Sequence, residues 1–135
     1  MGQHTTITEW DIQEATKANY VQMHSILTQY RNHGTGERRL VAQTIRPLLE
    51  SYLRLKLPTE FGDREWLGDF IKKIREADHT NPADAAKAIL EEVEAVNDFS
   101  KRYHHNTNTS ADSEPIDDGE LESYVTRTLQ IVGGF

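Results

Sequence analysis

The sequence predicts an all-α fold, a bundle of about five helices that run mostly antiparallel to one another. Apolar residues recur at steps of three and four along nearly the whole chain, which is the spacing of one helix face. No stretch of useful length alternates apolar and polar residues as a strand does. Short connections between the periodic segments favour an antiparallel bundle. The 135 residues fit a single helical domain, 1–135.

The first two helices are predicted on either side of a glycine-containing turn. Thr8 caps the first helix, and Gly34 and Gly36 end it by freeing the backbone. The second helix runs from about Glu37 to Leu57, and its broad apolar face predicts a central position. Pro47 removes the N–H that the carbonyl four residues earlier would accept. We therefore expect a kink in this long helix, or two helices that meet at the proline.

Two more helices are predicted in the middle of the chain. The third covers about Arg64 to Glu76, where apolar residues recur at helical steps. Asn81 and Pro82 signal the start of a fourth, because asparagine caps the first N–H groups and proline is tolerated at the first helical position. This helix continues towards Tyr103.

The last part of the sequence predicts a loop followed by a fifth helix. Residues 105–116 are rich in Asn, Thr, Ser and Asp, which predicts a mobile loop. The acidic residues of Asp117-x-x-Glu120 open the fifth helix, and Gly133 and Gly134 end it.

Composition narrows the classes of function. Cysteine is absent, which excludes disulfides, thiolate metal sites and a cysteine nucleophile. The chain has no apolar run that could span a bilayer and no signal-peptide pattern, so we expect a cytoplasmic protein without a membrane partner. The net charge of −7 argues against a general nucleic-acid coat. Residues 31–75 nevertheless hold 10 Lys/Arg against 6 Asp/Glu, a net of +4 that favours a local anion site.

Arg46 and Glu50 are the first candidates for chemistry. They are four residues apart on the second helix, so they share one face. The ordinary interpretation is a surface ion pair worth a few tenths of a kcal/mol. The apolar residues on both sides, and Pro47 between the two, indicate partial burial. A buried Arg–carboxylate unit is costly, which favours a functional role.

His104 and His105 are the second candidates, at the expected end of the fourth helix. An exposed titrating pair is the ordinary interpretation, but imidazole also has the pKa suited to proton transfer near neutrality. Asn97 is expected to project inward on the same helix, where a buried amide needs partners and can orient a histidine or a backbone turn.

Motifs for metals and nucleotides are absent from the sequence. The six histidines show no HExxH or His-x-His spacing, so we predict no metal site. Neither GxxxxGK[ST] nor GxGxxG occurs, so we predict no cofactor bound by those loops.

Two segments resemble a known group of proteins. The first is Arg38 to Pro58, which includes Ile45-Arg46-Pro47-Leu48-Leu49-Glu50, and the second is Val96 to Asp117, which includes Tyr103-His104-His105-Asn106. Together they resemble the C-terminal helical, HEPN-like region of bacterial AAA/ABC-type ATPases used in phage defence, among them the tRNA anticodon nucleases of phage-exclusion systems. The resemblance covers roughly residues 37–132 and implies that the chain is a fragment of a larger ATPase.

The resemblance also implies an activity and partners. In the anticodon nucleases an Arg, a Glu four residues later and a downstream His are the proposed active residues, which correspond to Arg46, Glu50 and either His104 or His105, with His105 preferred. Lys101 stands where an Asn-x-Phe-Ser-His pattern has its histidine, and Arg-x4-6-His is absent here. The implied activity is metal-independent cleavage of RNA, tRNA in particular.

Three interpretations remain open at this point. The chain is either this nuclease or a non-catalytic module of such an ATPase, used for dimerisation or for docking a partner. An unrelated helical adaptor is a further alternative. Trp10 lies off the main face of the first helix and predicts an apolar patch that a homodimer would cover.

Overall fold

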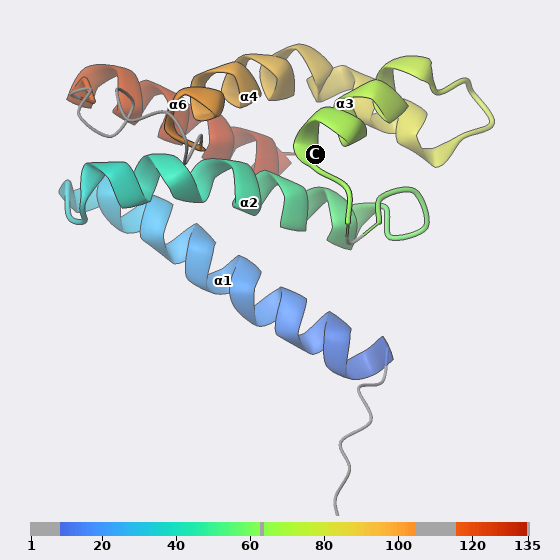
Figure 1. Cartoon of the computed structure of the whole chain (residues 1–135), viewed down its shortest axis with the longest axis horizontal. Helices are drawn as coiled ribbons and strands as arrows, with labels where there is room; N and C mark the ends of the chain where they lie inside the picture. Colours follow the sequence, from blue (N-terminus) through green and yellow to red (C-terminus); the bar gives the residue numbers. More distant parts are fainter. Residues whose placement is uncertain (1–8, 63, 105–115, 135) are drawn as a thin grey trace, which may run out of the picture.

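The computed structural model describes residues 9–62, 64–104 and 116–134, with the side chains of 18–62, 64–103 and 116–133. Within these ranges the chain forms five α-helices, one 3₁₀ helix and no strand, so the predicted all-α bundle is confirmed (Figure 1). The elements are α1 (Glu9–His33), α2 (Arg38–Lys56), α3 (Leu67–Glu76), η1 (Pro82–Ile89), α4 (Leu90–His104) and α6 (Asp118–Gly134). The expectations for Thr8, the Trp10 side chain, His105 and the loop at 105–115 lie outside the described residues.

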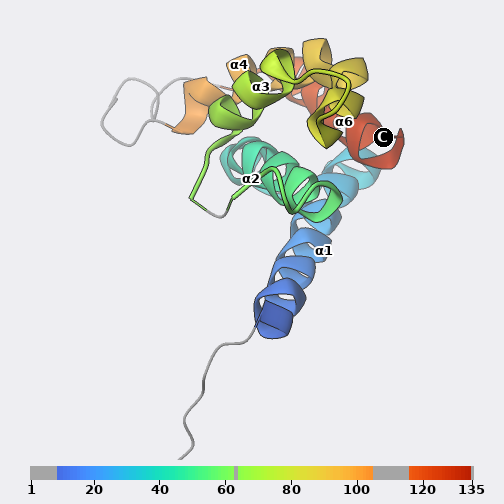
Figure 2. The same cartoon turned by 90° about the vertical axis from the view of Figure 1, so that its right-hand side faces the viewer.

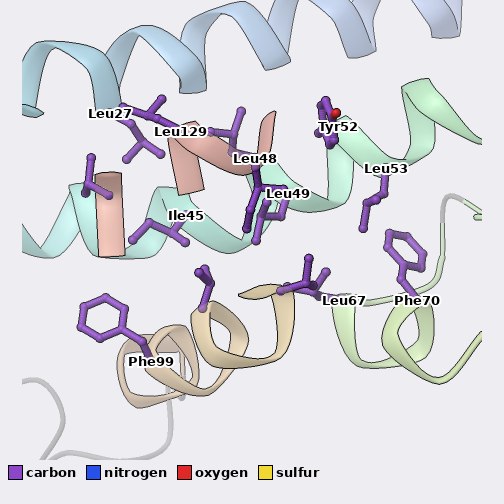
Figure 3. Packing of buried hydrophobic residues seen from close by; sticks show 14 of the residues in the cluster. Leu27, Ile45, Leu48, Leu49, Tyr52, Leu53, Leu67, Phe70, Phe99 and Leu129 are labelled. Atoms are coloured by element: carbon purple, nitrogen blue, oxygen red, sulfur yellow. The ribbon is translucent and has the colours of Figure 1, made fainter. Parts of the chain in front are cut away.

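Helix α2 is central, as its broad apolar face predicts. It packs against α1, α3, α4 and α6. Figure 3 shows its leucines between Leu27 of α1 and Leu129 of α6 on one side, and Leu67 and Phe70 of α3 on the other. The α2 residues with no exposed surface are Val41, Ala42, Ile45, Leu48, Leu49 and Leu53. Each large one contributes roughly 1.5–3 kcal/mol by leaving water, so α2 organises the core.

Pro47 lies inside α2 and does not divide it. The helix runs from Arg38 to Lys56 as one element, and Figure 1 shows α2 as one continuous ribbon. The alternative of two helices meeting at Pro47 is therefore wrong.

Helix α3 begins at Leu67, three residues later than predicted. The segment before it is held in another conformation by Arg54 of α2, whose guanidinium donates to the Gly62 carbonyl at 3.1 Å and to the Glu65 carbonyl at 2.7 Å. Trp66 is extended, with φ −100° and ψ 169°. Because these tertiary hydrogen bonds use carbonyls outside a helix, the helical turn forms only after Trp66.

The fourth predicted helix begins where expected but in a different form. Asn81 accepts the N–H of Ala83 at 2.8 Å, which confirms the cap. The first eight residues are then a 3₁₀ helix, and the α-helical form begins only at Leu90. Ala83, Ala86 and Ile89 stand three residues apart and turn towards the core, which suits the three-residue repeat of a 3₁₀ helix.

Helix α6 begins as its acidic start signal predicts. Asp117 accepts the N–H of Glu120 through its side chain at 2.8 Å. The hydroxyl of buried Tyr30, near the end of α1, donates to the Asp118 carboxylate, and Arg38 lies 3.6 Å from the same carboxylate. This cluster ties α1, α2 and α6 together at one end of the bundle.

The first turns of α1 lead away from the other helices. Both views show α1 diverging from α2 towards its N-terminal end (Figures 1 and 2). Among the described residues, no helix combines the length and apolar character needed to cross a bilayer.

Candidate functional site

Arg46 and Glu50 form an ion pair on the side of α2 that faces the start of α3. The Arg46 Nε lies 3.6 Å from the Glu50 Oε2, and their side chains are 24% and 7% exposed. The helical repeat places them on one face, as predicted. Most exposed pairs of this spacing contribute little because water screens them. This pair is mostly withdrawn from water, so its charges interact more strongly and cost more to desolvate.

Glu50 binds the first turn of α3. Its Oε2 accepts the N–H of Leu67, the first residue of α3, at 2.7 Å. Burial raises the pKa of the Glu50 carboxyl, while the Leu67 N–H and then Arg46 act in the opposite direction. A carboxylate at a helix N-terminus satisfies an unpaired N–H and meets the positive end of the helix dipole. Glu50 is therefore a tertiary cap of α3 as well as the partner of Arg46.

Trp66 covers Arg46 from the α3 side. The guanidinium carbon of Arg46 lies 5.6 Å from the centre of the Trp66 ring, a cation–π distance. The backbone N–H of Trp66 donates to the Asp69 carboxylate at 2.9 Å, which fixes the backbone that carries the ring. Trp66 is nevertheless 62% exposed. The site thus presents an open aromatic ring beside a partly covered arginine.

The end of α4 meets α2 one helical turn before Arg46. The Gln43 side-chain amide donates to the Tyr103 carbonyl at 3.0 Å, and the Arg39 guanidinium carbon lies 5.9 Å from the Tyr103 ring centre. His104, the last residue of α4, follows Tyr103 directly. The backbone that carries His104 is therefore about one α2 turn, roughly 5 Å along the axis, from the level of Arg46. The imidazoles of His104 and His105 lie outside the described side chains.

Asn97 is buried, as predicted, but two turns away from the end of α4. It is 5% exposed and precedes His104 by seven residues, which is roughly 10 Å along the helix. It lines a small cavity between α3 and α4, together with Gly68 and Lys101. Gln43 and Arg39 of α2 contact the end of α4 instead.

Three residues of this region escaped the sequence analysis. Gln43 is a polar residue one turn before Arg46 on the same face, and this spacing is a signal that sequence alone carries. Trp66 and Gly68 gave no such signal, because their roles depend on where α3 begins. That start is set by Arg54 and Glu50 from another helix.

The described part of the chain contains no group of three or more His, Cys, Asp or Glu residues placed to hold a metal ion. The polar stripe of α2, defined as Arg39, Gln43, Arg46, Glu50 and Arg54, instead joins α2 to the end of α4, the start of α3 and the segment between α2 and α3. Three of the five residues are arginines, whose planar guanidinium groups suit anion binding. No protein-family model, no curated protein and no solved structure matches this chain.

Proposed function

We propose that this chain is an RNA-cleaving effector domain of a larger, ATPase-controlled defence protein, and that it cuts RNA, tRNA in particular, without a metal ion. The observation that carries the proposal is the hydrogen bond from Gln43 to the Tyr103 carbonyl. It holds the end of α4, with His104 as its last residue, beside the turn of α2 that precedes Arg46. A histidine and an arginine near one phosphate are the groups that metal-free RNA cleavage needs.

In the proposed reaction a histidine, His104 or His105, takes the proton of a ribose 2′-hydroxyl. The 2′-oxygen then attacks the adjacent phosphorus, and the bond from phosphorus to the 5′-oxygen breaks. The leaving 5′-oxygen takes a proton from water, and the histidine then returns its proton to water. The product carries a 2′,3′-cyclic phosphate. Arg46 stabilises the charge of the five-coordinate phosphate through its planar, always protonated guanidinium.

Glu50 has a positioning role in this proposal. Its Oε2 already accepts the Leu67 N–H and faces the Nε edge of Arg46. A carboxylate engaged in this way holds the guanidinium in one orientation, with its terminal nitrogens available to a phosphate. Because the Leu67 N–H and Arg46 both favour the charged form, Glu50 orients Arg46 in this proposal and the histidine transfers the proton.

Total tRNA is the substrate for the test. We expect the purified chain to produce fragments with 2′,3′-cyclic phosphate ends, with unchanged yield in EDTA. Arg46→Ala, and His104→Ala combined with His105→Ala, should each reduce the rate at least about a hundredfold, since each removes one transition-state group. Arg38→Ala is the matched control, an exposed arginine of the same helix, and should leave the rate unchanged. Equal cleavage by all variants would contradict the proposal.

A second function is favoured by one specific observation. The Glu50 carboxylate and its ion pair hold α3 against α2, a use that requires no substrate. This favours a non-catalytic module that dimerises or docks a partner beside the ATPase. The diverging start of α1, which carries Trp10, is the surface we propose for a homodimer (Figure 2). Light scattering of the wild type and of Trp10→Ala at high concentration tests it, and a monomer in both excludes the dimer.

A further inference from the structure

A narrow groove runs between α3 and α4 on the side where both helices face solvent. Its volume is about 220 Å³, and it is lined by Gly68, Ile71, Arg75, Glu94, Asn97, Asp98 and Lys101. Arg75 pairs with Glu94 at 2.9 Å at one end. Gly68 lies seven residues before Arg75 on α3, and Lys101 lies seven residues after Glu94 on α4. Both line the groove, so the two helices run antiparallel along it, and Gly68 and Lys101 lie at its other end. Drug-sized ligands occupy about 300 Å³ or more, so this groove suits one small ring.

Asn97 gives the groove its chemistry. Its side chain is buried and makes no hydrogen bond with the part of the chain that the structure describes, although the amide lines the groove. The amide is not sealed from water, so it can exchange water in the groove for a ligand that enters it. An amide offers a donor and an acceptor side by side. The amide N–H can therefore donate to an acceptor on a ligand edge, while the amide oxygen accepts from a neighbouring donor on the same edge.

The charges around the groove favour a neutral ligand. Lys101 lies 3.8 Å from Asp98, and Arg75 is held by Glu94, so two cations and two anions balance one another. A phosphate or a metal ion would find as much repulsion as attraction in such a groove. A nucleobase is neutral and planar, and every base edge carries adjacent donors and acceptors.

Trp66 stands next to the Gly68 end of the groove, two residues earlier in the chain. Its ring is 62% exposed and has Arg46 on one face, at 5.6 Å from the guanidinium carbon to the ring centre. Large exposed aromatics beside a cation are the usual stacking platforms for unpaired bases. The groove and the ring are thus neighbours, and both lie beside the pair that we propose for cleavage.

We propose that the α3–α4 groove binds one unpaired nucleobase, with Asn97 hydrogen-bonded to its edge, while Trp66 stacks on the next base. This inference rests on the proposed function and adds its substrate class, which is single-stranded or looped RNA rather than duplex. A duplex hides its base edges and faces, so neither Asn97 nor Trp66 would reach them. The stacked base also places its phosphate near Arg46.

The test separates binding from cleavage by using single-stranded 2′-O-methyl RNA, which lacks the hydroxyl that the cleavage step needs. In a Trp10→Phe background the remaining tryptophan is Trp66, so its fluorescence reports stacking directly. We expect single strands to quench it and the matching duplex to leave it unchanged. Labelled RNA followed by anisotropy gives the affinities of variants, including Trp66→Ala, which should bind at least about fivefold more weakly because one stacked base contributes roughly 1–3 kcal/mol.

Two variants address the groove itself. Asn97→Ala removes the amide. Gly68→Leu is designed to fill the groove, because Gly68 lines it and a Cβ at this position meets no atom within 4 Å. We expect each to weaken single-strand binding about tenfold. Asn19→Ala, an exposed asparagine of α1, is the matched control and should bind like the wild type. Trp66→Phe keeps an aromatic ring and should restore most of the affinity that Trp66→Ala loses.

The outcomes for the two proposals differ. Binding of single strands that Gly68→Leu and Asn97→Ala weaken supports the base site, even if unmodified RNA is never cut, in which case the cleavage proposal alone fails. If Trp66→Ala, Asn97→Ala and Gly68→Leu all cleave RNA at the wild-type rate, the base site is overturned and the cleavage proposal stands. Absence of single-strand binding, or equal affinity for duplex, also overturns it. Circular dichroism and urea unfolding verify that both groove variants are folded. If Asn97→Ala does not fold, the affinity of Gly68→Leu for single strands decides the test.

Discussion

The starts of α3 and α6 are both built on carboxylates, but the carboxylates come from different places. At α6 the cap is local, because Asp117 accepts an N–H three residues later in the same helix. At α3 the first N–H goes to Glu50, which belongs to another helix and stands 17 residues earlier in the sequence. The α6 cap depends on the sequence around it. The start of α3 also has a local contact, from the Trp66 N–H to Asp69, but its first helical N–H depends on α2.

The two starts also differ in their surroundings. Glu50 is buried and is paired with Arg46, whereas Asp117, the cap of α6, is exposed. Water can replace a partner that an exposed carboxylate loses, but it cannot easily reach a buried one. The α3 start should therefore contribute more to stability, and it should be more sensitive to substitution.

Among the substitutions that test this comparison, Glu50→Ala should reduce the free energy of unfolding most. It leaves the Leu67 N–H without an acceptor and Arg46 as a mostly buried charge without its partner. We expect a loss of about 3 kcal/mol in the free energy of unfolding. Asp117→Ala removes the local cap of α6 and should cost about 1 kcal/mol. Urea unfolding followed by circular dichroism measures both.

The control for this contrast is Glu91→Ala, an exposed glutamate of α4 that should change stability by less than about 0.5 kcal/mol. Equal losses from Glu50→Ala and Asp117→Ala would show that the tertiary cap contributes no more than the local one. The same result would remove the structural role that we assign to Glu50.

The two helix starts also explain which parts of the fold were predictable. Asp117 and Asn81 each lie within a few residues of the N–H groups that they cap, so sequence alone predicts both helix starts. Both caps occur as predicted. The start of α3 was predicted three residues too early, because Arg54 and Glu50 act on it from α2. The 3₁₀ form of Pro82–Ile89 was missed since its buried alanines fit either period until the packing is known.

The candidate site was predictable to the same extent. The i, i+4 spacing predicts that Arg46 and Glu50 meet, and they do. Nothing in the sequence shows that Glu50 caps α3, or that Trp66 lies over Arg46, because both contacts join separate elements. The backbone at the end of α4 comes close to α2, where the Gln43 side chain donates to the Tyr103 carbonyl. Participation of His104 and His105 stays a prediction.

Tyr30→Phe should cause the next largest loss in the free energy of unfolding. It tests the start of α6, the other helix start of the comparison. The buried Tyr30 hydroxyl donates to the Asp118 carboxylate at the start of α6. A hydrogen bond to a charged acceptor contributes about 1.5–3 kcal/mol, and the exposure of Asp118 favours the lower value. We expect a loss of about 1.5 kcal/mol by urea unfolding. In a double-mutant cycle, Asp118→Asn should have little further effect once Tyr30→Phe is present, and additive losses would contradict the contact.

The same tyrosine predicts a pH dependence at high pH. Burial, and then the hydrogen bond to Asp118, raise the pKa of Tyr30 to about 12. The folded chain holds this proton more tightly than the unfolded chain, in which the pKa is about 10. The advantage over Tyr30→Phe is therefore complete below about pH 10 and is lost as the pH rises towards 12. The difference between the two unfolding free energies, measured across this range, should decrease.

The smallest expected effect concerns the charge on Glu50. Burial raises the pKa of its carboxyl above the ordinary value of 4.5, against the Leu67 N–H, Arg46 and Arg54, and with the help of Asp69. The folded chain thus binds the proton more readily than the unfolded chain, so stability should decline as the pH rises from about 4.5 through the folded pKa. Glu50→Gln keeps an acceptor for Leu67 and does not titrate. The wild type should therefore lose stability relative to this variant over that interval and then level off.

Asp69→Asn removes the charge that assists the shift, so in that background the decline should end at a lower pH. If the stability of the wild type relative to the Glu50→Gln variant instead rises with pH, Arg46 and the start of α3 outweigh burial.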